Sequence, residues 1–156
     1  MIDISADAIR KFHAKVRLWI SRKRVVNSIM SEMTETFLEF LLWGMKLYLI
    51  IDPDYRRNID DFHGLIRFRD RSGRVNVLVK FANGKMTTSE DPAAVADVTI
   101  LFKDESALRN YIIAPKKDIL NSLLHNEINI IGNFNYLYKF GFMANHLLLE
   151  FQRSSA

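Results

Sequence analysis

The spacing of apolar residues changes along this chain, and that change limits the folds the chain can adopt. Up to about residue 51, apolar residues recur every three or four positions, as on one face of a helix. From residue 63 to residue 103 they mostly alternate with polar residues, as on a half-buried strand. After residue 103 the helical spacing returns, interrupted by a short apolar run at 128–131. This order predicts one α+β domain in which helices cover a sheet.

The same spacing gives the boundaries of the expected elements. Helices are predicted at about 6–21, 31–50, 104–113, 116–125 and 134–151. Strands are predicted at about 63–69, 75–81, 85–89, 97–103 and 128–131. The Asn83-Gly84 pair suits a type I′ hairpin turn, and Asp52 and Pro53 should end the second helix. We expect residues 1–51 to pack on the same domain as residues 52–151, and residues 152–156 to form a disordered tail.

Composition excludes several classes of protein. The absence of cysteine among 156 residues rules out disulfides, thiolate catalysis and cysteine-based metal sites. The amino terminus lacks the positive charge and apolar run of a secretory signal, so we expect a cytoplasmic protein, which would still allow peripheral attachment to a membrane. The apolar segment 37–51 would span only about 22 Å as a helix, short of the roughly 30 Å of a bilayer core. Because it also contains Glu39 and Lys46, we interpret it as a core or interfacial helix.

The first predicted helix is strongly basic. No acidic residue occurs between Ala8 and Ser31, and the net charge of the whole chain is +4. Such a helix can face water, an anionic membrane, an acidic protein or, least favoured here, nucleic acid. A membrane or partner surface would comprise Arg10, Lys11, Lys15, Arg17, Trp19, Arg22, Lys23 and Arg24. A second basic patch is expected on the first hairpin, at Arg67, Arg69, Arg71 and Arg74.

The sequence contains no motif typical of catalysis or metal binding. The four histidines are not spaced as metal ligands, and we interpret them as solvated or capping residues. The glycines form no phosphate-binding loop, and no serine lies in a nucleophile-elbow motif. The adjacent carboxylates Asp60-Asp61 and Glu90-Asp91 are typical of turns and caps. We therefore expect no enzyme and no cofactor, although an active site whose residues meet only in space would leave no such signal.

Large apolar residues are concentrated in the helices that follow residue 103. With the inward residues of the strands, they would form the interior of the domain. Spacing alone does not distinguish a filled core from one that encloses a cavity, so both interpretations stay open.

Several stretches, in the same order, resemble the sterol carrier protein type-2 family. The resemblance covers about residues 52–148 and is carried by the segments 64–68, 70–74, 76–81, 83–85, 96–100, 104–105 and 128–133. The chain departs from the family where Asn126-Glu127 replaces a glycine-lysine pair and where residues 114–116 replace a glycine-containing link. The first fifty residues lie largely outside the resemblance and would be an extra N-terminal helical segment.

The resemblance implies a five-stranded, mainly antiparallel sheet covered by helices, with an apolar tunnel between them for a sterol, a fatty acid or an acyl-CoA. The residues expected to line the tunnel are Phe68, Val79, Phe81, Ile100, Phe102, Leu108, Ile112, Ile119, Leu123, Phe140, Met143 and Leu147. The expected function is non-catalytic binding or transfer of an apolar, lipid-like ligand. The alternative is a protein-interaction or scaffold module with a filled core, accessory to membrane-associated lipid or quinone metabolism.

Overall fold

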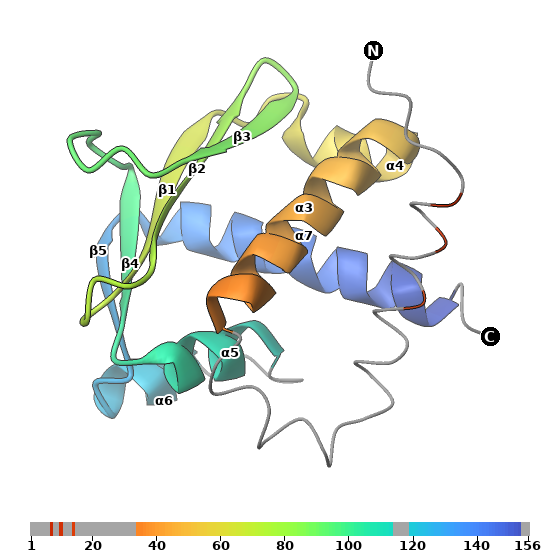
Figure 1. The fold of residues 1–156 in the computed structure, drawn as a ribbon. Helices are drawn as coiled ribbons and strands as arrows, with labels where there is room; N and C mark the ends of the chain where they lie inside the picture. Colours follow the sequence, from red (N-terminus) through yellow and green to blue (C-terminus); the bar gives the residue numbers. More distant parts are fainter. Residues whose placement is uncertain (1–6, 8–9, 11–13, 15–33, 114–118, 154–156) are drawn as a thin grey trace.

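The computed structural model of the protein describes residues 7, 10 and 14 and the ranges 34–113 and 119–153 (Figure 1). Within them the elements are α3 (Thr34–Ile51), α4 (Pro53–Arg56), the 3-10 helix η2 (Arg57–Ile59), β1 (Gly64–Asp70), β2 (Asn76–Ala82), β3 (Lys85–Ser89), β4 (Val98–Phe102), α5 (Glu105–Ile113), α6 (Ile119–Leu124), β5 (Ile128–Gly132) and α7 (Phe134–Arg153). Most of the predicted helix at 6–21 lies outside the described residues. So do residues 154–156 of the expected tail, whereas α7 itself extends to Arg153.

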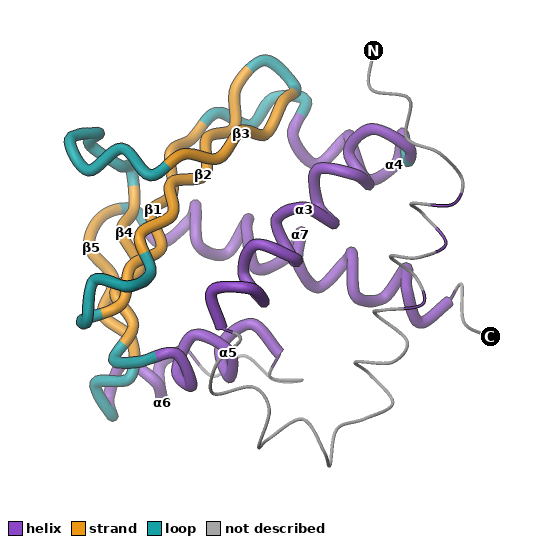
Figure 2. Tube along the Cα trace, viewed as in Figure 1, coloured by secondary structure: helices purple, strands orange, loops and turns teal. Residues whose placement is uncertain are grey.

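The five strands form one mixed sheet in the order β3-β2-β1-β4-β5. Strands β1 and β2, β2 and β3, and β4 and β5 pair antiparallel, whereas β1 and β4 pair in parallel. Helices α3, α5 and α7 lie on the same side of this sheet (Figures 1 and 2). The predicted fold class, an α+β domain whose mainly antiparallel sheet is covered by helices, is therefore confirmed.

The strands carry the alternation that the sequence predicts. In β4, Val98, Ile100 and Phe102 are fully buried, while the intervening residues are only half-buried. The register places Phe68 of β1 opposite Ile100, so that both side chains join the same layer beneath the helices. The hairpin turn between β2 and β3 has positive φ angles at both central residues, 53° at Asn83 and 66° at Gly84. These are the values that a type I′ turn requires, so this prediction is confirmed.

Helix α3 is buried around most of its circumference because it lies between several elements. It packs against α4, α5 and α7. The residues predicted to face one way are all buried: Leu38, Leu41, Leu42, Met45 and Leu49. The remaining face of α3 is exposed and includes two apolar residues, Trp43 at 44% and Ile50 at 54%. None of the helices within the described ranges combines the length and the apolar character needed to cross a bilayer.

A short helix follows α3 that the sequence analysis did not predict. Asp52 was expected only to end α3, but its side chain also accepts hydrogen bonds from the backbone N–H groups of Asp54 (2.9 Å) and Tyr55 (3.2 Å). Pro53 occupies the first helical position, where its missing N–H costs nothing. The pair therefore starts α4 as well as ending α3, and α4 carries the fully buried Tyr55 into the core.

The predicted second basic patch is wrong at Arg67. Alternation with the inward Ile66 and Phe68 places this residue on the face of the sheet opposite the helices, yet it is only 7% exposed. The loop between β3 and β4 covers it. Its guanidinium donates to the backbone carbonyl oxygens of Asp91 (3.0 Å) and Ala94 (2.6 Å) and to Asn76 Oδ1 (2.9 Å). Arg67 is thus a buried loop anchor, whereas Arg69, Arg71 and Arg74 are exposed as expected.

The turn between β1 and β2 depends on the buried carboxylate of Asp70. Val75 N–H donates to its Oδ1 (3.0 Å), and the Ser72 hydroxyl donates to its Oδ2. Burial disfavours the charged form, but these bonds, a further one from the Gly73 backbone and the nearby Arg74 together lower the pKa of Asp70. A carboxyl whose pKa is lower in the folded state stabilises the fold above its unfolded pKa of about 3.9. That contribution is lost as the pH falls through the folded value.

Asp70→Asn should therefore lower the free energy of unfolding by about 1–2 kcal/mol at pH 7, because the amide cannot accept both hydrogen bonds. The difference from the unsubstituted protein should shrink as the pH falls below about 4. Urea unfolding between pH 7 and pH 3 measures both effects. Asp61→Asn, at an exposed position, is the control and should change little. A difference that stays constant with pH would show that the Asp70 charge does not stabilise the turn.

Candidate functional site

The interior between the sheet and the helices contains most of the residues predicted to line a tunnel. Nine of the twelve are at most 1% exposed and belong to one apolar cluster: Phe68, Val79, Phe81, Ile100, Phe102, Leu108, Phe140, Met143 and Leu147. They come from β1, β2, β4, α5 and α7. Leu123 on α6 is only half-buried, and the side chains of Ile112 and Ile119 lie outside the described residues. The fold thus brings together residues from distant parts of the sequence.

Aromatic rings occupy the centre of this interior. The ring centroid of Phe68 lies 4.7 Å from that of Phe140 on α7 and 6.4 Å from that of Phe102 on β4. Phe102 in turn lies 5.9 Å from Tyr111 on α5. These are contact distances for aromatic pairs. A ligand could enter here only if the rings rotate or α7 moves away from the sheet.

Other apolar residues of the last helices face solvent. On α6, Leu120 and Leu124 are 68% and 72% exposed. On α7, Phe142 is 59% exposed, although its neighbours in sequence are buried. Together with Phe134, Tyr138 and Leu149 it forms an uncharged exposed stripe along α7. Some apolar residues of these helices therefore lie in the interior, and others lie on the surface.

A surface pocket of about 220 Å³ lies where helix α3 meets strands β2 and β3, and we call it the α3–β3 pocket. Its lining residues are Glu39, Leu42, Trp43, Lys46, Val77, Thr88, Ser89 and Glu90. Leu42 belongs to the buried core cluster, and Val77 packs against that cluster, so the apolar part of the pocket borders the core. Lys46 Nζ donates to Thr88 Oγ1 at 2.7 Å, and burial lowers the pKa of Lys46.

None of the pocket residues was predicted as a site residue. Glu39 and Lys46 were noticed only as charges inside an apolar segment. Their spacing of seven residues puts them on one face of a helix, two turns apart, and this was the available signal. The contribution of β3 could not be inferred, because nothing in the sequence pairs it with α3.

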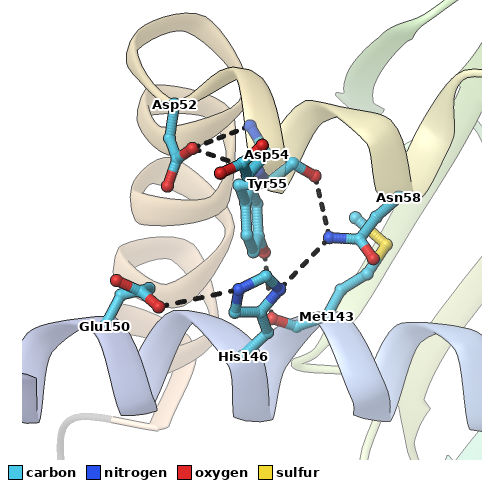
Figure 3. Close-up of polar contacts among 7 residues, drawn as sticks. All are labelled: Asp52, Asp54, Tyr55, Asn58, Met143, His146 and Glu150. Atoms are coloured by element: carbon cyan, nitrogen blue, oxygen red, sulfur yellow. Dashed lines mark hydrogen bonds and ion pairs between the residues drawn. The ribbon is translucent and has the colours of Figure 1, made fainter.

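Apart from the α3–β3 pocket, a cluster of polar side chains connects α4 and η2 to α7 (Figure 3). Tyr55 donates its hydroxyl hydrogen to the backbone carbonyl of Met143 (3.0 Å), and Asn58 Nδ2 donates to the Tyr55 carbonyl (2.8 Å). Asn58 Nδ2 also lies 3.3 Å from Nδ1 of His146, whose Nε2 is 3.7 Å from a Glu150 carboxylate oxygen. We predicted that the histidines are solvated or capping residues, and His146, inside α7, is neither. It is half-buried and helps fix α4 on α7.

Burial raises the pKa of Tyr55 in this cluster, so its hydroxyl stays protonated as a hydrogen-bond donor. The function of this cluster is structural, because its hydrogen bonds hold α4 against α7. Within the described part of the chain, no three histidine, aspartate or glutamate side chains are grouped as metal ligands.

The predicted membrane or partner surface falls almost entirely outside the described residues. Of its eight members only Arg10 is described, and it is exposed and helical. The other seven, Lys11, Lys15, Arg17, Trp19, Arg22, Lys23 and Arg24, lie in the undescribed ranges. Their role stays a prediction.

These features define a class of protein: a small α+β domain in which helices cover one face of a mixed sheet and enclose an apolar interior. No protein-family model and no curated protein sequence matches the chain. Among solved structures, one described as "UbiJ-SCP2 Ubiquinone synthesis protein" matches with a TM-score of 0.53 at 14% identity, over 66% of this chain and 84% of that chain. The described part of the chain therefore has the sterol carrier protein type-2 fold.

Two further structures show weaker likeness. The sterol carrier protein domain 2 of Helicoverpa armigera gives a TM-score of 0.49 at 14% identity, over 69% of this chain and 84% of that chain. A double mutant of the sec-alkyl sulfatase PisA1 gives 0.48 at 17% identity, over 69% of this chain but only 15% of that chain. Of these three structures, the first exceeds a TM-score of 0.5, and the fold assignment rests on it.

Proposed function

We propose that this protein binds an apolar, lipid-like molecule between its sheet and its helices and catalyses no reaction on it. The observation that carries this proposal is the apolar cluster of nine buried side chains, contributed by three strands and two helices of a sterol-carrier fold. A sterol, a fatty acid or an acyl-CoA would suit such a site.

The energetics of apolar burial support this proposal. Each methylene group withdrawn from water contributes about 0.8 kcal/mol, so a sixteen-carbon chain offers about 12 kcal/mol before any costs. Ordering the ligand and moving the rings of Phe68 and Phe140 would consume part of this gain. Binding of this kind needs no directed hydrogen bond, which explains why the sequence has no polar signature for the ligand.

A second candidate function is a protein-interaction or scaffold module. Two observations favour it: aromatic rings occupy the interior, and α7 exposes the uncharged stripe of Phe134, Tyr138, Phe142 and Leu149. An exposed apolar stripe is typical of a surface that another molecule covers. The name of the matched structure, a ubiquinone synthesis protein, makes membrane-associated quinone metabolism one setting for such a module.

Analysis of bound lipid separates the two candidates. We expect the purified full-length chain to carry one lipid-like molecule in native mass spectrometry, and to protect a fluorescent sixteen-carbon fatty acid from water. If the basic residues at 10–24 dock the carrier on a membrane, uptake should be faster from anionic vesicles than from neutral ones. A chain that carries nothing and leaves the probe in water would favour the interaction module.

A further inference from the structure

Helix α7 has two apolar sides, and only one of them faces the core of its own domain. The core-facing side is buried and consists of Leu137, Phe140, Met143, Ala144 and Leu147. The opposite side carries Phe134, Tyr138, Phe142 and Leu149, which are between 38% and 59% exposed. The ring of Phe142 contacts His146 on its own helix, yet 59% of the residue stays exposed. Packing within the domain therefore does not account for the second side.

This second side has the spacing of a helix-packing surface. We call it the α7 stripe, and with two exposed asparagines it comprises Phe134, Asn135, Tyr138, Phe142, Asn145 and Leu149. From Asn135 onward its members follow at intervals of 3, 4, 3 and 4 residues, the spacing at which one helix packs lengthwise against another. The stripe contains no charged residue, so it does not repel an identical stripe. At its margin, the ammonium of Lys139 lies over the ring of Phe62, 5.8 Å from the centroid.

The order of residue types in the α7 stripe is the same in both directions. An apolar residue stands at each end, an asparagine follows it from either end, and two aromatic residues stand in the middle. If two copies meet antiparallel, Tyr138 lies opposite the partner's Phe142 and Asn135 lies opposite the partner's Asn145, because the midpoint of each pair is residue 140. Each of these contacts then occurs twice, as a two-fold interface requires.

We propose that two copies of this chain associate antiparallel through the α7 stripe. The rings of Tyr138 and Phe142 form the apolar centre of the contact. The amides of Asn135 and Asn145 pair on either side of it, since each amide both donates and accepts hydrogen bonds. Polar pairs of this kind fix the register of packed helices. This inference does not depend on the proposed lipid binding, because the expected lipid site lies on the opposite side of α7.

The exposed area of the stripe predicts a weak dimer. At about 200 Å² for an aromatic residue, the four apolar residues offer roughly 400 Å² on each copy. A dimer would bury about 800 Å² of this surface together with the asparagines, which is at the low end for a specific interface. We expect a Kd of about 10–100 µM. Urea unfolding at about 1 µM protein therefore reports on the monomer.

Sedimentation equilibrium of the full-length chain, from about 2 to 300 µM, tests this proposal. The mass should rise from 18.2 kDa toward twice that value as the concentration increases. Phe142→Lys would place a charge against the partner's Tyr138 and should weaken the association by about tenfold or more. Leu120→Lys is the matched control, because Leu120 on α6 is similarly exposed, at 68%, but lies outside the stripe. It should leave the association unchanged.

Cross-linking tests the antiparallel arrangement, and the absence of native cysteine makes the result simple to interpret. Asn135→Cys and Asn145→Cys should form a disulfide with each other when the two variants are mixed under mild oxidation. Neither variant alone should cross-link to itself. Thr87→Cys, at an exposed position of β3, is the control and should not cross-link with either variant.

The unsubstituted chain decides the question of association even if a variant fails to fold. A chain that stays monomeric at the highest concentration would overturn the proposal, and so would a dimer that Phe142→Lys does not weaken. Self-cross-linking of each cysteine variant would overturn the antiparallel arrangement. If the chain is monomeric and Phe142→Lys lowers its binding to phosphatidylcholine vesicles, a membrane covers the stripe in place of a second copy. None of these results changes the expected binding of a fatty acid in the interior, which is measured separately.

Discussion

Gly132→Ala should destabilise the domain by about 3–5 kcal/mol, because the new side chain would collide with backbone. Gly132 ends β5 with a φ of 113°, a conformation that side-chain-bearing residues rarely adopt. A Cβ atom there would lie 2.2 Å from the carbonyl oxygen of Asp97 and 3.0 Å from Cα of Val98. The same Asp97 oxygen accepts a hydrogen bond from Asn133 N–H at 3.0 Å, so relief of the collision would also disturb the start of α7.

Urea unfolding at neutral pH measures this loss, and Gly73→Ala is its matched control. Gly73 also has a positive φ, 77°, but no atom lies within 4 Å of its virtual Cβ. The control variant should lose only about 1 kcal/mol, the cost of the left-handed conformation alone. Similar losses at the two positions would mean that the β4–β5 edge can move apart, and that the close approach at Gly132 is not required for stability.

Features that depend on neighbouring residues could be predicted from the sequence. The alternation of Val98, Ile100 and Phe102 identified β4 and its buried face, because the side-chain period of a strand is two. Asn83 and Gly84 identified their turn, because both readily adopt positive φ. At Asp52 and Pro53 a local signal for a helix start was present, but it was interpreted only as the end of α3.

Features that depend on contacts between distant segments could not be predicted. Alternation put Arg67 on the outer face correctly, but its burial comes from a loop more than twenty residues away, which no local pattern specifies. The α3–β3 pocket likewise needs Lys46 and Thr88 to meet across 42 positions of sequence. Spacing identified Phe68 and Phe140 as inward residues, but whether their rings fill the interior depends on side-chain angles that spacing does not determine.

The position of its ring makes Phe140 an informative core residue to substitute. Its ring is 1% exposed and lies against Phe68 at the centre of the expected tunnel. Phe140→Ala should cost about 3–5 kcal/mol, since it removes buried apolar surface and leaves a cavity. Phe142→Ala on the same helix is the control, because that ring is 59% exposed and its loss should cost about 0.5 kcal/mol or less. Urea unfolding measures both values.

The same pair of variants separates a lipid carrier from a filled interaction module through ligand binding. If the interior is the lipid site, the space left by Phe140 removes the cost of displacing that ring. Affinity for a sixteen-carbon fatty acid should then rise by about tenfold or more, and the bound ligand should restore much of the lost stability. In a filled module the cavity would stay empty, and fatty acid would not change the unfolding midpoint of Phe140→Ala. Phe142→Ala should leave fatty acid binding unchanged if the ligand lies inside, and should weaken it if the exposed stripe on α7 is the true contact.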